Sequence, residues 1–389
     1  MHFELPPEAE AYRATVKAWI AENPSPSPRT LAEAGYVAPH WPEPYGLDAD
    51  PIQQIVVDEE LKAAGISRPM NIIGIGWAGP TLIFAGSEDQ KQRYLPGILA
   101  GEEIWCQLFS EPGAGSDLAD LSTKAVRDGD EWVVTGQKIW TSLAQFAKYG
   151  ILLARTDPAA TKQEGISYFV CPMDADGIEI RPIIEMTGAH TFNEVFLDEV
   201  RIPADNLVGE VNRGWKLAKV TLGNERVSLS GEGALWGAGP TAADLVALVR
   251  QGGGCDEPHL RQRLAAVYAE GEVLRLIRMR TVSAAIAGRE PGPEASIRKA
   301  LADEHGQNVM GLAKDLAGAR GMLAGTGSYG GAEALVANDI WHHGFLFSPA
   351  LTIGGGTSEV QRNIIGERVL DLPREPDPGA TKGWAELHS

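Results

Sequence analysis

The chain has 389 residues and a net charge of −18, with 44% hydrophobic and 22% charged residues. This length and composition are typical of a globular protein with more than one domain, and the negative charge argues against nucleic acid as a partner, because phosphate would be repelled. No apolar run approaches the roughly 20 residues that span a bilayer, and the first residues lack a signal-peptide pattern, so we expect a cytoplasmic protein without a membrane span.

The first hundred residues have the pattern of a helical domain. Pro51 can occupy the first position of a helix, and Ser87 with Gln90 forms a capping-box pattern at the start of another. Residues 74–79 and 325–330 both match the glycine spacing of a dinucleotide-binding fingerprint. No alternation of strands and helices surrounds either match, so we interpret both as turns or close helix contacts.

From about Ile104 the pattern changes to short strands. Residues 124–127 and 131–135, separated by Asp-Gly-Asp, predict a hairpin that continues into residues 138–142, with further strands over 149–154 and 166–171. After Gly214 the helical period returns, with a long helix expected over 259–287. The last segment, from residue 373, is rich in proline and charge and is expected to be loose.

This order of elements predicts an α+β protein of three domains. We expect an N-terminal all-helical domain over residues 1–103, a middle β-sheet or barrel domain over 104–213 and a C-terminal helical bundle over 214–371, followed by a tail over 372–389. Three distant cysteines and eight histidines show none of the spacings of a disulfide framework or a zinc site, so we expect no metal.

Two segments of the predicted β region suit a flat polar ligand. Residues 107–117 read QLFSEPGAGSD, in which Gly113 and Gly115 allow backbone N–H groups to approach a ligand between two serines. Residues 136–142 read GQKIWTS, in which Trp140 offers a broad face beside two hydroxyl groups. Each feature alone has a common structural explanation as a turn or a core aromatic. Their combination favours a ring-shaped cofactor.

These segments resemble the acyl-CoA dehydrogenase family. The same resemblance extends to WPEPYG at 41–46, SEDQKQRYLP at 87–96, DEVRIP at 198–203, Gly214-Trp215 and GGTSEVQRNIIGERVL at 355–370. It therefore covers nearly the whole chain in the same α–β–α order. It implies an FAD-dependent oxidoreductase of lipid degradation that converts an acyl-CoA thioester to the trans-2-enoyl-CoA.

The resemblance also implies where the ligands bind. FAD would lie in a cleft between the β domain and the C-terminal helices, with Ser142 at flavin N5. The implied cofactor contacts are Gln107, Phe109, Ser110, Gly115, Ser116, Trp140, Thr141, Ser142, Gln262, Thr357 and Glu359. The implied substrate contacts are Ser116, Asn224, Arg226 and Gly356. Trp132, in the first half of the hairpin, is expected to lie away from the flavin.

One departure from the family pattern concerns the catalytic base. Many relatives carry a glutamate where this chain has Gly355, and a glycine cannot accept a proton. A subset of the family, including enzymes for isovaleryl- and long-chain acyl-CoA, places the glutamate on an earlier helix just before an arginine. Glu225 and Arg226 occupy that position here. The resemblance thus implies Glu225 as the α-proton base, hydride transfer to flavin N5 and the Gly355 N–H as a donor to the thioester oxygen.

Several alternatives stay open. Glu225 and Arg226 could be a solvated helix pair, and the chain could be one subunit of a two-chain dehydrogenase complex, or a flavin oxidase or monooxygenase on the same fold. The resemblance implies acyl-CoA as substrate, electron-transfer flavoprotein as acceptor and a homo-oligomer, or a hetero-oligomer with a related chain. The family's Arg-x-x-Phe-Gly segment is missing from residues 248–264, so either Arg250 or Arg261 could contact the flavin pyrophosphate. The acyl group is not identified.

Overall fold

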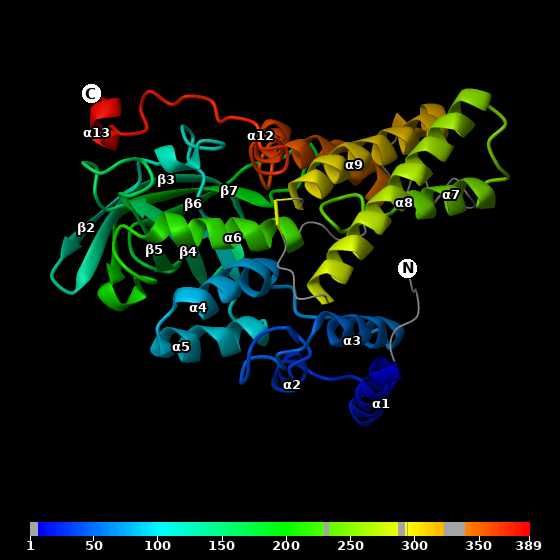
Figure 1. Ribbon diagram of the computed structural model, residues 1–389, viewed down its shortest axis with the longest axis horizontal. Coiled ribbons are helices and arrows are strands. Elements are labelled where there is room, and N and C mark those ends of the chain that lie inside the picture. Colours follow the sequence, from blue (N-terminus) through cyan, green and yellow to red (C-terminus); the bar gives the residue numbers. More distant parts are fainter. Residues whose placement is uncertain (1–6, 229–232, 287–291, 294, 323–338) are drawn as a thin grey trace. The chain divides into compact units, whose positions relative to one another are not determined.

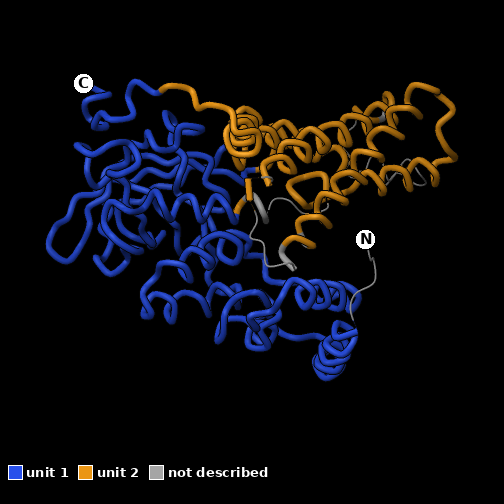
Figure 2. Tube along the Cα trace, in the orientation of Figure 1, with its two compact units in different colours: residues 1–183, 190–224, 377–389 blue, residues 184–189, 225–376 orange. Residues whose placement is uncertain are grey.

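The computed structural model describes residues 7–228, 233–286, 292, 293, 295–322 and 339–389. The chain forms two compact units, which Figure 2 shows in different colours. Unit 1 comprises residues 1–183, 190–224 and 377–389, and unit 2 comprises residues 184–189 and 225–376. The helices of the predicted N-terminal domain and the predicted β domain therefore belong to one compact unit. Within the described ranges, no helix is long and apolar enough to cross a membrane.

Helices form the first part of unit 1, as predicted. They are α1 (Pro7–Glu22), α2 (Pro28–Glu33), α3 (Pro51–Ala63), α4 (Gly79–Ala85) and α5 (Glu88–Leu99). Pro51 opens α3, and the predicted capping box of Ser87 and Gln90 opens α5. Pro51 has no N–H to leave unpaired, and the side chains of Asp50 and Ser87 accept N–H groups of the first turns of α3 and α5, which explains why these boundaries were readable from the sequence.

The glycine-rich residues 74–79 belong to this helical region. Gly74–Ala78 forms a π-helical turn that leads directly into α4. A Cβ atom added to Gly79 would lie 2.2 Å from the ring of Trp41, so glycine is required by close packing at this point. The interpretation of this stretch as a close helix contact is confirmed. The second match, residues 325–330, lies outside the described residues.

A seven-stranded sheet forms the rest of unit 1 (Figure 1). Its strands are β1 (Trp105–Leu108), β2 (Lys124–Asp128), β3 (Glu131–Ser142), β4 (Tyr149–Arg155), β5 (Ile166–Pro172), β6 (Ile178–Pro182) and β7 (Phe192–Pro203). The order is β1-β4-β2-β3-β7-β6, with β5 paired to β4. The predicted β2–β3 hairpin is confirmed, with Lys124 opposite Thr135 and Asp128 opposite Glu131.

The helices and the sheet of unit 1 are joined through α5. The side-chain amide of Gln90 donates to the carbonyl oxygens of Asp205 at 2.7 Å and Leu207 at 2.8 Å, in the segment after β7. The Tyr94 ring packs edge-on against Trp105 of β1, with 5.4 Å between the ring centroids. The capping residue Gln90 thus also fixes the helical part against the sheet.

The expectation of a loose C-terminal tail is wrong for its last residues. A short helix, α13 (Trp384–Leu387), contacts the middle β domain. The backbone N–H of Trp384 donates to the Ala160 carbonyl at 2.8 Å, and the Arg155 guanidinium lies 4.7 Å from the centroid of the Trp384 ring. These are tertiary contacts with residues more than 200 positions away, so the local composition of the tail could not indicate them.

Unit 2 is a helical bundle around α9 (Ala295–Ala317). This helix packs against α7 (Ala242–Gln251), α8 (Pro258–Ile286), α11 (Asp339–Phe347) and α12 (Ser358–Arg368). The bundle core includes Leu245, Val309, Met310, Leu312 and Trp341. The long helix expected over 259–287 is found as α8. One further helix, α6 (Gly214–Ser228), begins in unit 1 and ends in unit 2.

Candidate active site

The segment after β1 is anchored to β3 by a buried ion pair. Lys138 Nζ lies 2.8 Å from Glu111 Oε1, and their side chains are 0% and 5% exposed. Lys138 also donates to the Phe109 carbonyl at 3.0 Å, and Glu111 accepts the backbone N–H groups of Ser122 and Thr123 at 2.7 and 2.9 Å. The start of the EPGAGSD turn is thereby fixed on both sides.

The charges of this pair support each other. Burial acts to raise the pKa of Glu111, but Lys138 and the hydrogen bonds to the carboxylate outweigh it and lower the pKa to about 2. Burial lowers the pKa of Lys138, and Glu111 opposes that effect. Sequence reasoning missed both residues, although a lysine on the strand face that also carries Trp132 and Val134 was a usable signal.

Trp140 lies at an irregularity in β3. The pairing of β3 with β7 shifts register between Lys138 and Thr141, and Trp140 has a left-handed φ of 60°. Such a bulge re-aims a side chain. Trp140 is 57% exposed, while the neighbouring Thr141 is fully buried. The Phe192 ring supports the indole edge-on, with 6.0 Å between the ring centroids.

Two buried polar atoms lie beside this exposed indole. Thr141 Oγ1 and Asn193 Oδ1 have no hydrogen-bond partner in the part of the chain that the structure describes. The Asn193 amide group donates to the Thr141 carbonyl at 3.1 Å, which joins β7 to β3 at this point. Unpaired buried polar atoms are costly and indicate a missing partner. Asn193 was not among the predicted site residues, and no motif in the sequence points to it.

The other predicted residues of unit 1 surround the same strand ends. The Ile139 N–H donates to the Ser110 carbonyl at 2.9 Å, which brings the first predicted segment beside the second. Gly115 and Ser116 are exposed in the turn, and an added Cβ on Gly115 would meet no atom within 4 Å. Gln107 and Ser142 are half-buried. Phe109 is only 2% exposed and packs against Tyr168, so its ring belongs to the interior.

A buried hydroxyl cluster anchors α6 in unit 1. Thr221 Oγ1 lies 2.8 Å from Thr81 Oγ1 of α4 and 3.1 Å from Tyr168 Oη of β5. Burial raises the pKa of Tyr168, so its hydroxyl stays protonated at neutral pH. Glu225 follows Thr221 by one helical turn on the same face of α6 and is 7% exposed. The part of α6 that belongs to unit 1 is therefore anchored through Thr221.

Two further predicted residues flank Glu225 on α6. The side-chain amide of Asn224 donates to the Val220 carbonyl of its own helix at 3.1 Å. The backbone of Arg226 is helical, but its side chain lies outside the described residues.

The remaining predicted residues belong to unit 2. Gly355 and Gly356 have left-handed φ values of 69° and 93°, which favour glycine. Thr357 caps α12 by accepting the Val360 N–H at 3.3 Å, and Glu359 is exposed in the first turn of that helix. Gln262 occupies an exposed position on α8.

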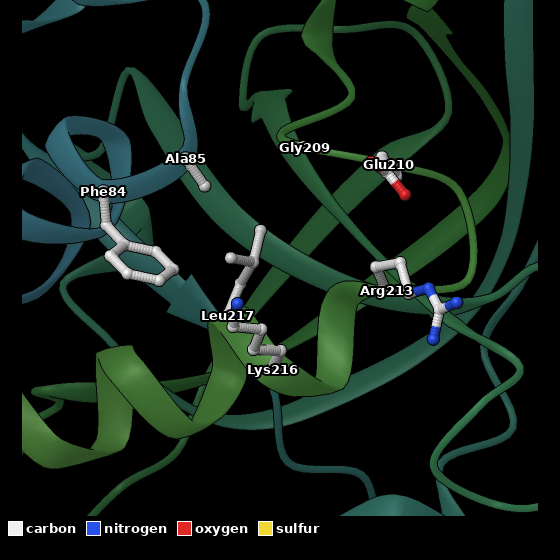
Figure 3. A pocket seen from close by; sticks show the side chains of 7 residues that line it. All are labelled: Phe84, Ala85, Gly209, Glu210, Arg213, Lys216 and Leu217. Atoms are coloured by element: carbon white, nitrogen blue, oxygen red, sulfur yellow. The ribbon is translucent and has the colours of Figure 1, made fainter.

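A pocket of 460 Å³ lies elsewhere in unit 1 (Figure 3). It is bordered by the end of α4, the segment before α6 and the first turn of α6, through Phe84, Ala85, Gly209, Glu210, Arg213, Lys216 and Leu217. None of the predicted site residues lines it. We therefore assign no ligand to it.

Comparison with known proteins decides the family. The chain matches the acyl-CoA dehydrogenase N-terminal domain over residues 4–102, the middle domain over 106–200 and the C-terminal domain over 212–370. It is 37% identical to acyl-CoA dehydrogenase IpdE1 of Mycobacterium tuberculosis over 95% of this chain and 99% of that protein. The chain belongs to the acyl-CoA dehydrogenase family. It is accordingly a flavoprotein oxidoreductase of lipid degradation with the acyl-CoA dehydrogenase fold.

Three further proteins are similar to this acyl-CoA dehydrogenase. Acyl-CoA dehydrogenase FadE34 of Mycobacterium tuberculosis is 41% identical over 95% of this chain, which spans 49% of the length of FadE34. A solved steroid ACAD, Tcur3481-Tcur3483, is 31% identical with a TM-score of 0.78, covering 96% of this chain and all of that one. The ChsE4-ChsE5 complex from Mycobacterium tuberculosis is 32% identical with a TM-score of 0.75, at the same coverage.

The family uses FAD, and the residues of unit 1 fit a flavin. An isoalloxazine ring needs a flat apolar face and hydrogen-bond partners at its edge, and the exposed Trp140 beside the unpaired Thr141 hydroxyl offers both. The open space beside Gly113 and Gly115 leaves their backbone N–H groups approachable. The ion pair of Glu111 with Lys138 fixes the start of this turn.

Trp140→Ala is expected to weaken FAD retention by roughly 1 kcal/mol, or about fivefold in Kd, because an aromatic platform is lost. The measurement is the FAD occupancy of the purified variant and its Kd after reconstitution. Phe84→Ala, an equally exposed aromatic on α4 at 54%, is the matched control and should retain FAD. Equal affinity in the two variants would show that Trp140 does not lie on the flavin.

Trp132 is unsuitable as that control. It lies away from Trp140 but is 6% exposed and packs against Phe169, with 5.3 Å between the ring centroids. Its truncation would open a cavity in the core at a cost of about 3–5 kcal/mol. Loss of FAD would then reflect unfolding of the sheet.

Proposed function

We propose that this acyl-CoA dehydrogenase uses Glu225 as the base that removes the α-proton of an acyl-CoA, giving the trans-2-enoyl-CoA. The observation that carries the proposal is the pairing of a glycine at the usual position of the base with a buried glutamate on α6. Gly355 has a left-handed φ of 69° and no carboxylate, while Glu225 is 7% exposed. Burial near an apolar acyl chain suits a base, because it raises the proton affinity of a carboxylate.

The other roles follow from the same proposal. The thioester oxygen gains negative charge as the α-proton leaves, and the backbone N–H of Gly355 would stabilise it. A glycine keeps this donor although it lacks the carboxylate. Asn224, Arg226, Gly356 and Ser116 would position the acyl-CoA. When bound, FAD supplies the acceptor for the β-hydride.

The proposed cofactor contacts divide between the two units. In unit 1 they are the strand ends and the turn: Gln107, Phe109, Ser110, Gly115, Ser116, Trp140, Thr141 and Ser142. We add Asn193, because its Oδ1 is buried and unpaired among the described residues. In unit 2 they are Gln262, Thr357 and Glu359, which would bind the ADP part.

We further propose a steroid-derived acyl-CoA as substrate and assembly with a related chain. Support comes from the solved relatives, of which one is a steroid ACAD and another is the ChsE4-ChsE5 complex. Electron-transfer flavoprotein is the proposed acceptor. We also propose domain boundaries at residues 103, 213 and 371. A cytoplasmic location is proposed as well, because the three free cysteines suit a reducing compartment.

The purified protein is expected to be yellow and to release FAD, not FMN, on denaturation. Anaerobic addition of straight, branched and steroid-side-chain acyl-CoAs should bleach the flavin, with the fastest rate for a steroid-derived thioester. Slow recovery in air supports a dehydrogenase, and recovery within seconds indicates an oxidase. If no acyl-CoA reduces the flavin until a related chain is added, this chain is the non-catalytic member of a pair.

A further inference from the structure

A buried lysine of α9 holds the glycine turn before α12. Lys299, which is 2% exposed, donates from Nζ to the carbonyl oxygen of Gly356 at 2.7 Å and to that of Leu351 at 3.2 Å. Its third neighbour is the carboxylate of Asp303, one turn later on α9, at 2.5 Å. An ammonium group has three N–H donors. Two of these donors are directed to the carbonyl oxygens at the two ends of the segment 351–356, and the ammonium group also forms an ion pair with the Asp303 carboxylate.

The carboxylate partner is as deeply buried as the lysine. Asp303 is 3% exposed, and burial raises its pKa to about 6, although Lys299 acts in the opposite direction. Keeping two charges in the interior is costly unless their geometry is used. Here the paired lysine holds the carbonyl oxygen of Gly356 in place.

A second buried side chain reaches the same turn from α12. The amide of Gln361, which is fully buried, donates to the carbonyl oxygens of Gly355 at 3.2 Å and Gly356 at 3.3 Å. In a trans peptide the N–H points away from the C=O. The N–H groups of Gly356 and Thr357 therefore point away from Lys299 and Gln361.

The backbone donors of this turn have no protein acceptor among the described residues. The N–H groups of Gly355, Gly356 and Thr357 donate no hydrogen bond to any part of the chain that the structure describes. Three consecutive glycines, 354–356, have the greatest backbone freedom of any residues, so such a turn does not hold its own N–H groups in one direction. Something outside the turn must fix them.

We infer that Lys299, held by Asp303, is a positioning residue that fixes the Gly354–Gly356 turn with its N–H donors ready for the thioester oxygen. The inference rests on the proposed function, in which the Gly355 N–H of this turn stabilises the developing negative charge. Electrostatic stabilisation of this kind depends on donors that are oriented before the reaction. Lys299 does not touch the substrate and acts through the turn.

The test uses the FAD-loaded enzyme and a chromophoric thioester, 4-(dimethylamino)cinnamoyl-CoA. Hydrogen bonds to the carbonyl of this probe polarise it and shift its absorption to longer wavelength, so the shift reports the donors without turnover. The variant is Lys299→Met with Asp303→Leu, which removes both charges together and leaves no unpaired ion. Its red shift is expected to fall to less than half of the wild-type value.

Activity with the best acyl-CoA supplies a second readout. In the same variant kcat is expected to fall at least about tenfold, with KM changed less than about threefold, because the lost interaction grows in the transition state. Lys314→Met is the matched control, since Lys314 lies on the same helix and donates to the Gly321 carbonyl at 2.6 Å, away from the turn. The control should keep both the red shift and kcat.

If the double variant does not fold, Lys299→Gln with Asp303→Asn replaces it, because glutamine is too short to reach both carbonyls and the same losses are expected. A variant pair with wild-type red shift and wild-type kcat would overturn the inference and leave the proposed function standing. A wild-type enzyme that neither shifts the probe nor reduces its flavin with any acyl-CoA would overturn the proposed function and the inference with it.

Discussion

Glu225→Gln is expected to bind acyl-CoA while the rate of flavin reduction falls at least about a hundredfold. The amide keeps the shape of the carboxylate but cannot accept the α-proton, and removal of a general base costs this much or more. The measurement is anaerobic stopped-flow reduction with the best substrate, alongside a binding titration. Glu60→Gln is the matched control, because Glu60 is also buried, at 8% exposure, and pairs with Arg13 on α1.

A second substitution tests the position of the base. Adding Gly355→Glu to Glu225→Gln should restore part of the reduction rate, if both positions face the same α-carbon. Restoration is expected to be partial, because residue 355 has a φ of 69°, which costs roughly 1–2 kcal/mol for a residue with a side chain. Reduction at the wild-type rate in Glu225→Gln alone would exclude Glu225 as the base.

Glu111→Gln is expected to destabilise unit 1 by about 3–5 kcal/mol, because it leaves the Lys138 ammonium buried without a counter-charge. The free energy of unfolding in urea and the FAD occupancy should fall together. Glu111→Leu with Lys138→Met removes both charges and is expected to recover most of the stability. A single variant as stable as the wild type would show that the pair does not anchor the turn.

The same pair predicts a dependence of stability on acid. The pKa of Glu111 is lowered from 4.5 to about 2 in the folded protein, so its ionised form stabilises the fold. This contribution is full above about pH 4.5 and is lost as the pH falls through about 2. The double variant lacks the carboxylate, and its unfolding free energy should fall less between these two pH values than that of the wild type.

Much of the candidate site could be proposed from the sequence because its residues are adjacent in the chain. Trp140, Thr141 and Ser142 are consecutive, as are Gly355, Gly356 and Thr357, and the structure places each set on one strand end or one turn. Of the missed residues, Glu111 and Lys138 lie within the two predicted segments, and the others act from another element. Asn193 reaches Thr141 from β7, and Lys299 reaches Gly356 from α9.

The sequence by itself determined the boundaries that depend on local chemistry. The side chains of Asp50 and Ser87 cap their helices by accepting backbone N–H groups two or three residues away, and the turn after Asp128 closes the predicted β2–β3 hairpin. These interactions are completed within a few residues, so the pattern alone contains them. The absence of a carboxylate at Gly355 was equally plain from the sequence.

The tertiary structure alone decided which way the decisive side chains point. Strict alternation along β3 would direct Lys138 and Trp140 to the same face. The extra residue against β7 instead leaves Lys138 and Thr141 buried and turns Trp140 outward. The register between β3 and β7 arises from the packing of segments about 50 residues apart. The contact of Trp384 with Arg155 likewise joins residues that are far apart in the sequence. Local patterns do not specify such pairings, because their energy comes from surfaces that meet only in the folded chain.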